Sequence, residues 1–216
     1  MEPAAILTGD LIGSTAAASD DVDLAMVALS GAADQIATWA GTDTRFTRFR
    51  GDGWQIYLAE PSLILRAMLL LIARLRSEEP GLATRLSIAV GPVDRLGASG
   101  LAEAAGPAFT LSGRNLDKML TYSSLAYAAP EQKDFWKPAV LDLAHWQAGR
   151  WTREQAEAVA LALDRPRPAD AALAEKLGIT RQALQSRLKG SGIMAMSRAL
   201  LAFVQDSFEG ETKKHA

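Results

Sequence analysis

The chain has 216 residues, of which 49% are hydrophobic and 22% are charged, a balance typical of proteins that bury a core. This composition excludes collagen-like, mucin-like and wholly disordered proteins. The sequence contains no cysteine and two histidines, which excludes disulfides, cysteine-ligated zinc and thiol nucleophiles. Any metal ion would have to bind carboxylates.

The hydropathy pattern argues against export and against a membrane partner. The chain starts Met-Glu-Pro, without the basic segment of a signal peptide, and we expect a cytoplasmic protein. Its most apolar stretch, residues 62–75, contains two arginines and is too short to span a bilayer. Charge is unevenly distributed along the chain. Residues 1–149 hold 12 basic and 17 acidic residues, whereas residues 150–216 hold 11 basic and 8 acidic residues, so the C-terminal part is mildly basic.

The first half of the chain alternates between strand and helix patterns. An apolar run at residues 4–8 predicts a buried strand that ends at Asp10, and apolar residues spaced by three and four from Val22 to Ala40 predict a helix. Residues 45–50 and 54–58 predict a hairpin with its turn at Asp52-Gly53. Beyond it the patterns predict a helix over 61–77, a strand over 84–90, a long loop over 91–107 with room for a short helix, a helix over 108–120, a strand over 123–128 and a helix over 130–146.

This order of elements predicts an α+β fold, a ferredoxin-like sheet with its helices on one face. We expect this domain over residues 1–129, a connecting helix over 130–149, a small all-α domain over 150–209 and a disordered tail over 210–216. Three tryptophans near the junction, Trp136, Trp146 and Trp151, are expected to pack between the two domains.

The C-terminal part has the spacing of a helix-turn-helix. Helices are expected over 152–163, 169–177, 180–189 and 193–208, and Ala174, Gly178 and Thr180 stand where the two central helices meet. Ala174 is small enough for close packing, Gly178 suits the turn, and Thr180 suits the cap of the second helix.

The second helix of this motif carries side chains that suit DNA. Arginine and glutamine can contact base edges in the major groove, and a helix N-terminus with its threonine can bind a phosphate. The candidate DNA-binding residues are Thr180, Arg181, Gln182, Gln185, Ser186, Arg187 and Lys189. A protein-interaction module with a solvated polar face is the alternative.

Two aspartates are candidates for a metal site. Asp10 ends the first predicted strand and Asp52 lies in the hairpin, so both would stand together if these strands are neighbours. Mg²⁺ and similar ions prefer hard oxygen ligands and are often held by one or two carboxylates plus substrate phosphates. The alternative is that Asp52 serves the turn and Asp10 caps the loop after the strand.

Three segments, residues 6–15, 49–53 and 106–114, resemble in order the motif blocks of class III nucleotidyl cyclases. The chain is most similar to the SatD-like family, which resembles a reduced cyclase catalytic domain, over about residues 4–128. The resemblance implies a head-to-tail homodimer and Mg²⁺ or Mn²⁺ at Asp10 and Asp52. It also implies an Arg114 that stabilises charge on a phosphate; the alternative for Arg114 is an ion pair with Asp117.

The same resemblance implies a nucleotide site. Arg48, Glu103 and Thr110 stand where the cyclases have a purine-reading lysine, its partner aspartate and a ribose-orienting asparagine. The residues implied to bind the metal and the phosphate are therefore the same types as in the cyclases, whereas those implied to recognise the base and the ribose are different types. These candidates, with Arg114, form the predicted nucleotide-binding set.

Two functions follow as hypotheses. The first is a dimeric, DNA-binding transcriptional regulator whose cyclase-like domain senses a nucleotide or another phosphate ligand. The second is a metal-dependent nucleotidyl cyclase or related phosphoryl transferase, with Arg114 as a catalytic residue and a regulatory helical tail.

Overall fold

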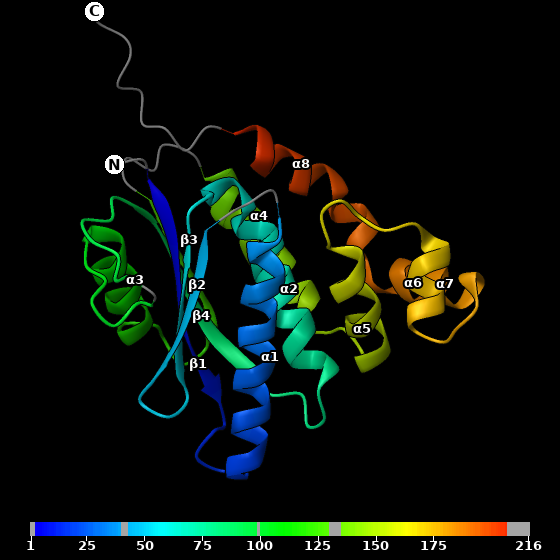
Figure 1. The fold of residues 1–216 in the computed structure, drawn as a ribbon, viewed down its shortest axis with the longest axis horizontal. Helices are drawn as coiled ribbons and strands as arrows, with labels where there is room; N and C mark the ends of the chain where they lie inside the picture. Colours follow the sequence, from blue (N-terminus) through cyan, green and yellow to red (C-terminus); the bar gives the residue numbers. More distant parts are fainter. Residues whose placement is uncertain (1–2, 40–42, 99, 130–134, 207–216) are drawn as a thin grey trace, which may run out of the picture.

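The chain forms a five-stranded sheet with helices on both faces (Figure 1), in a computed structural model that describes residues 3–39, 43–98, 100–129 and 135–206. The strands are β1 (Ala4–Ile12), β2 (Thr44–Phe49), β3 (Gly53–Leu58), β4 (Ala83–Gly91) and β5 (Leu125–Ala128), in the order β2-β3-β1-β4-β5. Neighbouring strands are antiparallel except β4 and β5, which are parallel. This confirms the predicted α+β class and the ferredoxin-like order of the first four strands.

Helices cover both faces of this sheet, so the prediction that all of them share one face is wrong. Helix α1 (Ser19–Ala37), the short helix η1 (Pro61–Leu63) and helix α2 (Ile64–Ser77) lie on one face, and α3 (Pro107–Asp117) lies on the other. Side chains alternate across each strand, and Leu7 of β1 therefore joins the core under α1 and α2 while Ile6 joins the smaller core under α3.

The helical part packs on the outer side of α2. It consists of α4 (Trp136–Ala148), α5 (Arg153–Ala162), α6 (Asp170–Lys176), α7 (Arg181–Ser191), η2 (Ile193–Met196) and α8 (Ser197–Gln205). Helix α5 runs along α2 and presents small buried residues, among them Ala156 and Ala160, which allow close approach. One continuous apolar core therefore extends from the sheet through α2 into the helical part.

The three junction tryptophans have different roles. Trp151 is fully buried; its indole nitrogen donates to the carbonyl of Ser191 at 2.6 Å, and its own carbonyl accepts from Arg76 of α2 at 2.7 Å. Trp136 packs edge-on against Phe203 of α8. Trp146 is 56% exposed, so its predicted packing role is wrong. Trp146 lies on the solvent-facing side of α4, so its ring does not face the core.

Other differences concern boundaries and loops. The predicted helix over 108–120 and strand over 123–128 are shorter, as α3 and β5. Helix α3 already begins at Pro107; before it, residues 91–98 and 100–106 contain no helix, and Arg95 and Ala105 form an isolated bridge instead. Residues 130–134 of the connecting helix and the expected tail over 210–216 lie outside the described residues. None of the helices in the described ranges is long and apolar enough to cross a bilayer.

Candidate functional site

Two close backbone approaches set the positions of Asp10 and Asp52. A Cβ atom on Gly9 would lie 2.5 Å from the carbonyl oxygen of Arg85, and one on Gly53 would lie 2.8 Å from that of Phe49. Only glycine fits at either point: Gly9 lets β1 approach β3 and β4 closely, and Gly53 lets β3 approach β2. Asp10 pairs with Gly53 across the sheet, so the two predicted strands are neighbours.

The hairpin turn lies two residues earlier than predicted. Phe49 pairs with Gly53, and the positive φ angles belong to Arg50 (50°) and Gly51 (81°) rather than to Asp52-Gly53. Asp52 is therefore the last loop residue, and its carbonyl accepts a hydrogen bond from the amide of Leu11 at 3.2 Å. This bond places Asp52 at the end of β1, beside Asp10.

Both aspartates already have partners. Arg85 of β4 lies directly opposite Asp10 and donates from Nε to Oδ1 at 2.8 Å and from Nη2 to Oδ2, a two-point ion pair. The Ser14 hydroxyl donates to Oδ2 of Asp52. The hydrogen bonds to Asp10 raise the pKa of the Arg85 guanidinium, and the negative charges around it, including Asp52 and Asp117, raise it further. Arg85 therefore stays charged and lies among three carboxylates.

The side chains of Asp10, Asp52 and Ser14 are suitable ligands for a divalent cation, but the present side-chain conformations leave Asp10 occupied by Arg85. Two carboxylates and the Ser14 hydroxyl are the hard oxygen donors that Mg²⁺ and Mn²⁺ take. Both oxygens of Asp10, however, accept from Arg85, and the described residues hold no cluster of three or more acidic or histidine side chains spaced to bind a metal. A cation at Asp10 therefore competes with Arg85 for both carboxylate oxygens.

Sequence reasoning missed Arg85. The pattern of β4 places Leu86, Ile88 and Val90 on the core face, which leaves Arg85 and Ser87 on the face of Asp10. That alternation predicts that Arg85 lies on the α3 face, but only the strand order shows that it lies opposite Asp10.

The predicted nucleotide-binding set is not brought together within one chain. Arg48 lies on the α1 face of the sheet, where its guanidinium pairs with Asp23 at 2.6 Å and donates to the carbonyl of Gly51. Glu103 and Thr110 lie on the other side, in the loop before α3 and in its first turns, and both are exposed. A nucleotide could therefore not contact Arg48 and Thr110 of the same chain at once.

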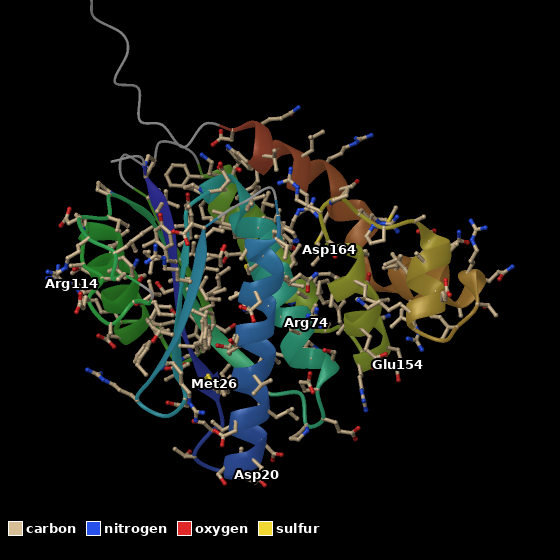
Figure 2. The ribbon with its side chains drawn as sticks, in the orientation of Figure 1. Asp20, Met26, Arg74, Arg114, Glu154 and Asp164 are labelled. Atoms are coloured by element: carbon tan, nitrogen blue, oxygen red, sulfur yellow. The ribbon has the colours of Figure 1, made fainter. Side chains whose placement is uncertain are left out.

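Arg114 is exposed on α3 (Figure 2). Ser112 and Leu116 are buried toward the sheet, so the residue between them points away from Asp10 and Asp52 of its own chain. The alternative ion pair with Asp117 is absent from the described residues. Arg114 therefore faces solvent rather than the two aspartates.

The helix-turn-helix has the geometry that its residues predict. Leu173 and Ala174 of α6 are buried against α7, Gly178 in the turn has a φ of 64°, and the Thr180 hydroxyl accepts from the amide of Ala183 at 3.2 Å. The roles of Ala174, Gly178 and Thr180 in this local structure are confirmed.

The candidate DNA-binding residues fall into two groups. Five of them project into solvent from α7: Arg181, Gln182, Gln185, Ser186 and Lys189. Arg187 is instead half-buried and pairs with Glu157 of α5 at 3.4 Å, and the Thr180 hydroxyl is engaged as the cap. Gln185 also reaches Asp170 of α6 at 3.4 Å, a weak contact that a ligand can replace.

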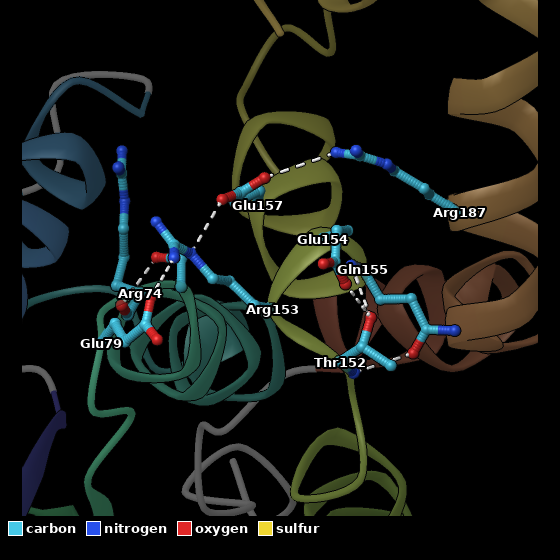
Figure 3. Close-up of polar contacts among 9 residues, drawn as sticks. Arg74, Glu79, Thr152, Arg153, Glu154, Gln155, Glu157 and Arg187 are labelled. Carbon is cyan, nitrogen blue, oxygen red and sulfur yellow. Dashed lines mark hydrogen bonds and ion pairs between the residues drawn. The ribbon is translucent and has the colours of Figure 1, made fainter. Parts of the chain in front are cut away.

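Figure 3 shows that Arg187 ends a chain of ion pairs across the helical part. Glu79, after α2, pairs with Arg153 at 2.5 Å; Arg153 pairs with Glu157 at 3.3 Å; and Glu157 pairs with Arg187. Exposed pairs of this kind contribute little individually. Only the pair between Glu157 and Arg187 links α5 to α7, and it engages the Arg187 guanidinium within the protein.

Comparison with solved structures shows similarity to a cyclase. The fold is similar to the crystal structure of the guanylyl cyclase Cya2, with a TM-score of 0.39 and 19% sequence identity, over 54% of this chain and 70% of that chain. No protein-family model matches the sequence, and no curated protein matches it.

Proposed function

We propose that this protein is a DNA-binding transcriptional regulator that acts as a homodimer and contacts the major groove through α7. The observation that carries the proposal is the paired geometry of α6 and α7, with a glycine turn and a capped second helix whose outer face is polar. The mild positive charge of residues 150–216 supports it, since DNA binding depends on phosphate neutralisation.

The chemistry of α7 is divided along its length. Arg181 and Gln182 lie in the first turn, the part of a recognition helix that contacts base edges, and both can make bidentate contacts with bases. Lys189 lies in the last turn, where it suits a phosphate. In a dimer the two α7 helices would occupy half-sites about 34 Å apart.

We expect Arg181→Ala and Gln182→Ala each to weaken specific DNA binding by about 1–3 kcal/mol, because each removes a base contact. The target is first selected from a random duplex library with the wild-type protein, and fluorescence anisotropy then measures each variant on the selected duplex. Arg198→Ala on α8 is the matched control, since it removes an exposed arginine outside α7. Equal weakening by the control, or no enrichment of any sequence, would contradict the proposal.

The cyclase-like sheet would serve as the sensor. The motif resemblance to SatD-like proteins supports a nucleotide or another phosphate ligand, and Arg114, exposed and pointing away from its own aspartates, supports a site completed by a second protomer. Calorimetry with Mg²⁺ and a panel of nucleoside mono-, di-, tri- and cyclic phosphates tests this step. Saturable binding that Arg114→Ala removes would support it, and a blank panel would limit the sheet to a structural role.

A metal-dependent nucleotidyl cyclase is the second candidate, supported by the adjacency of Asp10 and Asp52. Here the chain's own residues would hold Mg²⁺ or Mn²⁺, and the metal would activate a hydroxyl and neutralise phosphate charge. A product scan by mass spectrometry with each nucleoside triphosphate tests this function. Product from the wild type and none from Asp52→Asn would support an enzyme; equal product from both would reject the assignment.

We expect Arg85→Met to strengthen Mn²⁺ binding by about tenfold or more, because it frees Asp10 and removes a positive charge from the site. Titration followed by the electron paramagnetic resonance of free Mn²⁺ measures the affinity. Arg95→Met, which removes an arginine in the loop before α3, is the control. Adding Asp10→Asn to Arg85→Met should abolish the gain; a gain that persists would place the metal elsewhere.

A further inference from the structure

A cavity of about 830 Å³ lies on the far side of α2 from the sheet, between the α5–α6 loop, α7 and α8. We call it the α7–α8 cavity. Its apolar wall consists mainly of Leu188 of α7 and of Leu200, Leu201 and Val204 of α8. Leu201 and the neighbouring Met194 are more than half exposed, so the apolar surface continues to the rim. This size and lining are typical of small-molecule sites.

The polar part of the cavity is mainly cationic. Four basic side chains and two acidic ones line it: Arg66, Arg165, Arg167 and Lys189 against Asp164 and Asp170. Both acids are already engaged, since Asp170 pairs with Arg167 at 2.6 Å and Asp164 accepts from the indole nitrogen of Trp39 at 3.0 Å. An excess of positive charge therefore faces the cavity.

Arg66 has one unsatisfied donor, although its guanidinium carbon also lies 5.9 Å from the centroid of the Trp39 ring. Its Nη1 donates to the carbonyl of Leu163 at 3.0 Å, but its Nε is buried without a hydrogen-bond partner, and no carboxylate of the described residues forms an ion pair with it. Burial lowers the pKa of the Arg66 guanidinium, and the positive charge of Arg165 lowers it further. Two guanidiniums close to one another at an apolar cavity attract an anion.

We propose that the α7–α8 cavity binds an amphipathic anion, a molecule with one carboxylate or phosphate headgroup and an aliphatic or aromatic body. The headgroup meets Arg66 and Arg165, and the body lies along Leu188, Leu200 and Leu201. This site is separate from Asp10 and Asp52, which lie across the sheet from α2. The proposal does not depend on DNA binding.

The position of the cavity gives the ligand a regulatory contact. Leu188 and Lys189 belong to α7, so a bound ligand touches the helix that carries the candidate DNA contacts. If the proposed function holds, ligand and DNA affect each other's affinity by the same factor, because such coupling is reciprocal. Failure of that coupling would leave the binding site itself intact.

Calorimetry of the full chain tests the proposal, with decanoate and decyl phosphate below their micelle concentrations and decanol below its solubility limit. We expect one saturable site per chain for at least one of the two anions and binding of decanol weaker by about tenfold or more. The stronger of the two anions identifies the headgroup. No saturable anion binding, or equal binding of decanol, would overturn the proposal.

Matched variants of α2 locate the site. Arg66→Met should weaken anion binding by about tenfold or more and leave decanol binding unchanged, since a charged hydrogen bond is lost while the apolar wall stays. Arg74→Met is the control: it removes an arginine of the same helix that also has a buried, unpartnered Nε but does not line the cavity. An equal loss from both variants would overturn the assignment.

Leu201→Glu keeps the test decisive if Arg66→Met does not fold. It places a negative charge at an exposed rim position, so it should weaken anion binding while leaving the thermal unfolding midpoint within a few degrees of the wild type. Analytical sedimentation of this variant and of the wild type tests whether a second copy of the chain, rather than a small molecule, contacts the apolar rim. Dissociation of a wild-type dimer by Leu201→Glu would identify the cavity as a contact between two copies of the chain and overturn the ligand proposal.

Discussion

Trp151→Ala should reduce the free energy of unfolding by about 3–5 kcal/mol, the range for removing a large aromatic side chain from a core. The indole is fully buried between α2 and the helical part, and its loss also removes the shorter of the two hydrogen bonds to the Ser191 carbonyl, leaving only the one from Gln147. Both effects act at the contact that joins the two halves of the chain, so a single unfolding transition should move as a whole.

Denaturant unfolding followed by circular dichroism measures this change as a shift of the midpoint at constant slope. Trp146→Ala is the matched control, since it removes the same residue type from an exposed position and should cost no more than about 0.5 kcal/mol. Similar shifts for both variants would show that Trp151 does not anchor the junction.

Gly9→Ala should cost about 3 kcal/mol or more, because overpacking in a close-packed interior forces the backbone to move. The new Cβ would lie 2.4 Å from Cζ2 of Trp54 and 2.5 Å from the carbonyl oxygen of Arg85. The Trp54 indole cannot move without losing its hydrogen bond to Thr84, and the carbonyl belongs to the adjacent strand. The strain therefore reaches Asp10 and its ion pair with Arg85.

Gly31→Ala is the same substitution as Gly9→Ala, but we expect it to stabilise the protein. Gly31 lies in the interior of α1, is exposed, and has no atom within 4 Å of an added Cβ, so alanine should stabilise the protein by about 0.5–1 kcal/mol. Thermal and denaturant unfolding of both variants measure whether the free energy of unfolding falls for Gly9→Ala and rises for Gly31→Ala. Destabilisation by Gly31→Ala, or tolerance of Gly9→Ala, would contradict the packing described for β1.

Local patterns were sufficient for the order of elements and for the helix-turn-helix. The spacing of Leu173, Gly178 and Thr180 lies within eight residues, and each acts on the chain beside it, so its role can be read without knowing the fold. The hairpin was located, but its turn was placed on Asp52-Gly53, because Asp-Gly is a common turn pair and the close approach of Gly53 to Phe49 involves packing across the strands.

Contacts between distant segments could not be derived in this way. Arg85 and Asp10 are 75 positions apart, and only the strand order brings them opposite each other. Arg187 has the periodicity of an outward residue, yet Glu157 of another helix draws it inward. Arg48 lies in a strand whose two faces are both half-exposed, so its alternation did not indicate which face it occupies.

The position of α2 has a consequence for cleavage and for truncated forms of the protein. Its outer side is covered by α5, and Arg66 and Arg76 bind carbonyl groups at the two ends of that helix, Leu163 and Trp151. A protease cut near residue 150 would therefore release no pair of independently stable pieces. The N-terminal fragment would expose an apolar helix flank and aggregate, and the C-terminal fragment would lose the surface on which it is built.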